Sequence, residues 1–133
     1  MDQNEPLKML EELAQESAKY PVEAFHFIRE GLQYAVTRLH GQKGQQPKHI
    51  SGQELCWGLR DYALKLWGLM APEVLRRWGI TRTDDFGAMV FAMVEAGWMA
   101  KSDHDTVRDF DGVFEFRAAF DAQIDLGKFQ EAS

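Results

Sequence analysis

Apolar residues recur at helical spacing along most of the chain, and this pattern predicts an almost entirely helical protein. A first helix is expected from about Pro6 to Ala18, with Asn4 as its cap. A second should run from Pro21 to about His40. This second segment carries apolar residues on two sides, which is typical of a helix that packs between two neighbours. We therefore place the second helix at the centre of the fold.

A glycine- and glutamine-rich stretch at 41–48 interrupts the pattern and predicts a loop. Ser51 and Glu54 then have the spacing of a capping box, so a third helix should begin there. Gly68 is expected to end this helix. The apolar face of this helix is expected to contain Leu55, Leu59, Tyr62 and Leu66.

Two further helices follow the third. A short one is expected from Glu73 to Trp78, after Pro72. The next should start at Thr83, whose hydroxyl is of the type that caps helices.

After Gly97 the helical period fails, and the pattern becomes that of short strands. Residues 98–101 and 106–110 are predicted to pair as a β-hairpin around the polar turn at 102–105, with a last short helix at about 116–125. Helix, short helix, turn, helix and hairpin is the order of a winged helix-turn-helix. The expected fold class is therefore mainly α, with about six helices, a short hairpin and a winged-helix-like arrangement.

Length and composition are those of one globular domain. The chain has 133 residues, of which 45% are hydrophobic and 27% charged. We expect a single domain over residues 1–133, with a flexible loop at 41–48 and a short tail at 127–133. The one cysteine, Cys56, fits a reducing compartment. With no signal-peptide pattern and no long apolar run, we expect a cytoplasmic protein that does not bind membranes.

Basic residues form two clusters, although the net charge is −6. The candidate anion-binding residues are Arg38, Lys43, Lys48 and His49 around the loop, and Arg76, Arg77 and Arg82 beside Trp78. Each cluster can hold a few phosphates, or it can be a solvated loop or a helix end that complements its own dipole. The expected recognition helix instead begins with Asp84 and Asp85, which would repel DNA. Nucleic-acid binding is therefore the second hypothesis.

Motifs for catalysis, metals or cofactors are absent from the sequence. The four histidines form no HxxxH or HExxH pair, and no glycine-rich phosphate loop is present. Cys56 lies one turn into the third expected helix, where it is either a small buried hydrophobe or a thiol activated by the helix. No cofactor is expected, and a small enzyme with a site assembled across the fold is the third hypothesis.

Aromatic residues favour a role in protein binding. Trp57, Phe91 and Trp98 lie at the edges of their apolar stripes, where an interface would use them. The alternative is a wide core that buries all three. The leading hypothesis is a non-enzymatic module that binds another protein or a second copy of itself.

Several segments resemble a known family. The sequences are KYPVEAFHFIREGLQYAV (19–36), HISGQEL (49–55), RRWGITRTDDFGAMVF (76–91), VEAGW (94–98) and VFEFRAAFD (113–121). In their order and spacing they are similar to the Minf-type family of small bacterial proteins, which has no settled function. The resemblance implies a bacterial protein but no activity. It also draws attention to His49, Arg82 and Asp85, polar residues beside helix starts that are candidates to line one groove.

Overall fold

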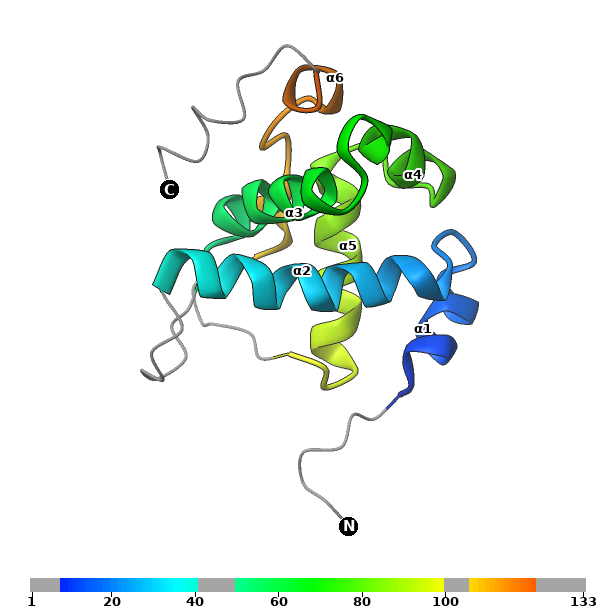
Figure 1. Cartoon of the computed structure of the whole chain (residues 1–133). Helices are drawn as coiled ribbons and strands as arrows, with labels where there is room; N and C mark the ends of the chain where they lie inside the picture. The colour runs from blue at the N-terminus through cyan, green and yellow to red at the C-terminus, as the bar shows by residue number, and fades with distance from the viewer. Residues whose placement is uncertain (1–7, 41–49, 100–105, 122–133) are drawn as a thin grey trace.

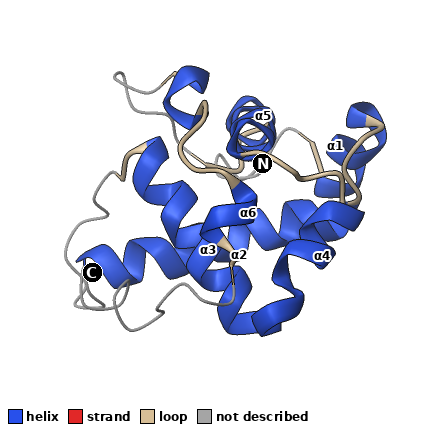
Figure 2. Ribbon diagram, turned by 90° about the horizontal axis from the view of Figure 1, so that it is seen from above, coloured by secondary structure: helices blue, strands red, loops and turns tan. Residues whose placement is uncertain are grey.

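In the computed structural model, residues 8–40, 50–99 and 106–121 are described, and regular structure within them is helical throughout (Figure 2). The elements are α1 (Leu10–Ser17), α2 (Val22–His40), α3 (Gly52–Trp67), the 3₁₀ helix η1 (Gly68–Met70), α4 (Ala71–Arg77), α5 (Thr83–Glu95), the 3₁₀ helix η2 (Val107–Phe110) and α6 (Phe116–Ala119). Helix α3 runs alongside α2, and α5 crosses behind both (Figure 1). The mainly helical content is as predicted.

The predicted β-hairpin is wrong, and so is the winged-helix-like arrangement that depended on it. No strand occurs within residues 8–40, 50–99 and 106–121, and Val107–Phe110 form the 3₁₀ helix η2. The Asp109 carboxylate accepts a hydrogen bond from the Thr106 amide at 3.0 Å, and the Asp109 amide donates to the Thr106 carbonyl. These two bonds close a tight turn that an extended strand cannot make. The expected turn at 102–105 lies outside the described residues.

Helix starts were predicted with mixed success. The capping box is confirmed, because Ser51 Oγ accepts from the Glu54 amide at 3.0 Å and Glu54 Oε1 accepts from the Ser51 amide at 2.8 Å. Thr83 does not cap α5, since Arg82 is the cap residue and Thr83 is already helical. Helix α1 starts at Leu10, later than expected, and residues 1–7 lie outside the described part of the chain.

The closest approach between helices joins α2 and α3 at two glycines. A Cβ on Gly31 would overlap the side chain of Leu59, and a Cβ on Gly58 would overlap the Cβ of Ala35. The two backbones therefore approach more closely than ordinary side chains permit. Since α2 also packs against α1 and α5, its predicted central position is confirmed.

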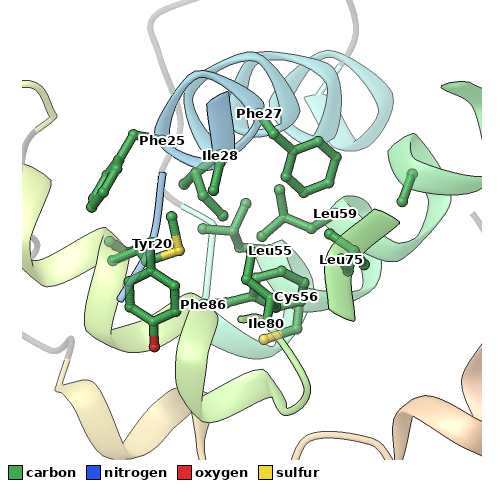
Figure 3. Close-up of a cluster of buried hydrophobic side chains, with 14 of the residues drawn as sticks. Tyr20, Phe25, Phe27, Ile28, Leu55, Cys56, Leu59, Leu75, Ile80 and Phe86 are labelled. Carbon is green, nitrogen blue, oxygen red and sulfur yellow. The ribbon is translucent and has the colours of Figure 1, made fainter. Parts of the chain in front are cut away.

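The core lies between α2, α3 and α5. Phe25, Ile28, Leu59 and Phe86 are almost fully buried, and they converge from these three helices (Figure 3). Such close packing of apolar side chains supplies most of the free energy that opposes chain entropy.

The segment after η2 is held to α5 by polar and apolar contacts. Thr83 Oγ1 donates to the Phe110 carbonyl at 2.6 Å and accepts from the Val113 amide at 3.0 Å. The Phe110 ring packs where Gly52 and Gly87 have no side chains, and a Cβ on Gly87 would lie 2.7 Å from the Phe110 Cβ. These contacts fix residues 106–113 against the rest of the protein.

Candidate functional site

The basic cluster on α4 is partly neutralised by its own helix. Glu73 Oε2 accepts from Arg76 Nη2 at 2.6 Å and from Arg77 Nε at 3.0 Å. Hydrogen bonds from these two guanidiniums lower the pKa of Glu73 to about 2, so the carboxylate stays ionised. Arg82 pairs with Asp84 at 3.3 Å. The predicted second anion site therefore contains two carboxylates, which weaken its attraction for phosphate.

The predicted basic cluster near the loop is described only at Arg38. This side chain donates to Asp61 and, at 2.7 Å, to the Tyr34 hydroxyl, while its guanidinium lies 5.4 Å from the centre of the Tyr34 ring. Arg38 lies in α2 and the buried Asp61 lies in α3, so this ion pair links the two helices. The other members, Lys43, Lys48 and His49, lie outside the described residues. The groove that His49 was expected to line with Arg82 and Asp85 is therefore not described either.

The three aromatic residues predicted for an interface all pack against the core while remaining half-buried. Trp57 contacts Phe114, with ring centres 4.6 Å apart, and Phe91 meets Phe110 edge to face. Trp98 Nε1 donates to the Lys8 carbonyl at 2.7 Å, and the Arg29 guanidinium lies over its ring. Each ring thus has an internal structural role, and an additional role in binding stays a prediction.

A reactive thiol or a cluster of metal-ligating side chains among the described residues would favour catalysis or metal binding. Cys56 is fully buried, and burial raises the pKa of its thiol, so the thiolate that a nucleophile needs is disfavoured. Within the described ranges, no three His, Cys, Asp or Glu side chains gather as metal ligands would. His26, on α2, is exposed.

A buried polar cluster surrounds Asp85. One carboxylate oxygen accepts from Tyr20 Oη and, at 2.9 Å, from Lys19 Nζ. The other accepts from the amides of Thr81 and Arg82. Burial opposes ionisation, but the hydrogen bonds from Tyr20, the Thr81 amide and Lys19 outweigh it, and the pKa of Asp85 is lowered. Because the carboxylate is fully engaged, the cluster is a structural link between the α1–α2 turn and the start of α5.

Exposed apolar side chains concentrate at the end of α3 and in η1. Three large apolar side chains within five consecutive residues are exposed: Leu66 is 45% exposed, Leu69 72% and Met70 59%. Gly68, between them, has a positive φ of 55° and ends α3 as predicted, with no other atom near enough to contact an added Cβ. We call these three side chains the docking surface. Leu66 was expected on the buried face of its helix, and that expectation is wrong.

A layer of aromatic rings lies beside the docking surface. Trp67 packs on Phe27 and Trp78, with ring centres 5.3 and 5.4 Å apart, and Phe27 also stacks on Tyr62. These rings hold the end of α3 against α2 and α4. The residues that flank the docking surface are therefore packed against the core.

The sequence contained a signal for this surface that its helical pattern concealed. Leu66 precedes Gly68, and Leu69 and Met70 follow it, with Pro72 two residues further on. Periodicity assigned Leu66 to a helix face and left Leu69 and Met70 without a place. Only the arrangement of α3 and α4 shows that all three point outward.

No family model, curated protein or solved structure matches this chain. Within the described residues, no helix is both long enough and apolar enough to cross a membrane.

Proposed function

We propose that this protein is a non-enzymatic module that binds another protein through the docking surface. The observation that carries the proposal is the exposure of Leu66, Leu69 and Met70 within five residues. Single exposed apolar residues are common, but large neighbouring ones are kept at a surface mainly when they are covered in a complex. Among the described residues, the other exposed large apolar side chains are scattered: Met9 precedes α1, Leu39 lies in α2 and Val107 lies in η2.

Two further observations support binding over chemistry. The only thiol is buried, and the arginines of α4 are engaged with Glu73. A cytoplasmic location and the similarity to the Minf-type family remain part of this proposal, and neither adds an activity to it.

The test removes two apolar side chains from the docking surface and, in a control, two exposed apolar side chains from elsewhere on the protein. The test variant is Leu69→Ser with Met70→Ser, and the control is Met9→Ser with Val107→Ser, which changes side chains of similar exposure elsewhere. Partners captured from the source cells by the wild-type protein should be lost by the test variant and kept by the control. If both variants keep the same partners at the same yield, the proposal is wrong.

A further inference from the structure

The charges next to the docking surface differ in sign from those of the whole chain. Between Tyr62 and Trp78 the chain carries three basic side chains, Lys65, Arg76 and Arg77, and one acidic side chain, Glu73. The segment is therefore net positive, whereas the complete chain has a net charge of −6. Glu73 can balance only one of the two guanidiniums that it binds.

The arginines lie where a ligand on the docking surface would meet them. Leu69 and Met70 lie in η1, which leads directly into α4, and Arg76 and Arg77 end α4. Each apolar residue is seven residues from an arginine, a separation of at most about 25 Å even for an extended chain. The side chains of Arg76 and Arg77 are 64% and 75% exposed. A partner helix of about 18 residues is about 27 Å long, so one that covers Leu69 and Met70 is long enough to reach both guanidiniums.

We infer that the docking surface binds an acidic amphipathic segment of a partner protein, with its apolar side chains on Leu66, Leu69 and Met70 and its carboxylates on Arg76 and Arg77. The inference rests on the proposed function and adds the chemistry of the partner. A nucleic acid would satisfy the arginines but would leave the apolar side chains uncovered. A second copy of this chain in face-to-face contact would bring two positive segments together.

The experiment uses two peptide probes and the full-length protein. Each peptide has about 18 residues, enough for a stable helix, with leucines at helical spacing and either glutamate or lysine elsewhere. Fluorescence anisotropy measures the binding of each. We expect the Leu–Glu peptide to bind at least tenfold more tightly than the Leu–Lys peptide, a difference of about 1.4 kcal/mol. Added salt should reduce this preference because it screens the charges.

Charge-reversal variants test whether Arg76 and Arg77 cause the preference for the Leu–Glu peptide. Arg76→Glu with Arg77→Glu should weaken binding of the Leu–Glu peptide roughly tenfold or more. The control, Arg108→Glu with Arg117→Glu, changes the net charge equally at two other exposed positions and should have little effect. Circular-dichroism melts check that the variants fold, and Arg76→Gln with Arg77→Gln gives the same test with a smaller change of charge.

The outcomes separate this inference from the proposed function. If both peptides bind equally and Leu69→Ser with Met70→Ser abolishes binding of both, the surface binds apolar segments without regard to charge, and the inference is wrong while the proposed function stands. If neither peptide binds, the inference is overturned, and the capture experiment decides the proposed function. If sedimentation shows a dimer that Leu69→Ser with Met70→Ser dissociates, the occupant is a second copy, which also overturns the inference.

Discussion

Tyr20 donates its phenolic hydrogen to the carboxylate of Asp85, a residue 65 positions further along the chain. Tyr20 lies in the turn between α1 and α2, and Asp85 lies in the first turn of α5. The bond therefore joins two segments that are far apart in the sequence. Burial and the contact with Asp85 together raise the pKa of Tyr20 to about 12.

This shift predicts a loss of stability at alkaline pH. The unfolded chain releases the Tyr20 proton near its ordinary pKa of 10.0 and the folded chain only near 12, so the folded state holds more protons between these values. The free energy of unfolding must then fall as the pH rises through this window. Tyr20→Phe should lose about 1.5–3 kcal/mol of stability near pH 7, and this deficit should shrink towards pH 12. Urea unfolding at pH 7, 10 and 12 measures it, and a deficit that does not change with pH would contradict the prediction.

The glycine at the crossing of α2 and α3 can be tested with a compensating change. Gly58→Ala should destabilise the protein by about 1–3 kcal/mol, because the new methyl group overlaps the Cβ of Ala35. Adding Ala35→Gly removes that methyl group and should recover part of the loss, although glycine itself costs about 1 kcal/mol in a helix. Thermal melts of the two single variants and the double variant form a cycle. Purely additive effects would mean that the two positions do not touch.

The Thr83 hydroxyl can be removed with little change in shape. Thr83→Val should cost about 1–3 kcal/mol, because the Phe110 carbonyl and the Val113 amide both lose a buried partner. Thr83→Ser keeps the hydroxyl and should retain both bonds. Hydrogen exchange should show faster exchange of the Val113 amide in Thr83→Val than in Thr83→Ser. Equal rates would indicate that the hydroxyl does not anchor this segment.

Trp98 connects the end of α5 to the residues before α1. Because its ring is only half-buried, Trp98→Ala should cost about 2–3 kcal/mol, less than the loss of a fully buried tryptophan. Trp98→Phe keeps a ring beside Arg29 but loses the bond to the Lys8 carbonyl, and its cost should be smaller. Denaturant melts give both values, and sedimentation shows whether association changes. A Trp98→Ala variant that melts like wild type but loses self-association would make Trp98 an interface residue instead.

Much of the local structure could be predicted from the sequence, because local structure depends on neighbours in the chain. The capping box of Ser51 and Glu54, the stop at Gly68 and the extent of α2 follow from hydrogen bonds and side-chain spacing within a few residues. Burial of Cys56 was one of two expectations, and the structure decides between them.

Tertiary structure decided the features that depend on distant residues. Residues 106–110 have the alternation of a strand, but Thr83, Gly52 and Gly87 hold them as a 3₁₀ turn against α5. Other long-range contacts gave Asp85 two of its four donors, Lys19 and Tyr20, and gave the aromatic layer its place. They also left Leu66, Leu69 and Met70 at the surface, where periodicity alone would have buried Leu66. The sequence by itself thus determined where α2, α3 and α5 form. The packing of α3, α4 and α5 determined which side chains are exposed, because exposure depends on elements that are far apart in the chain.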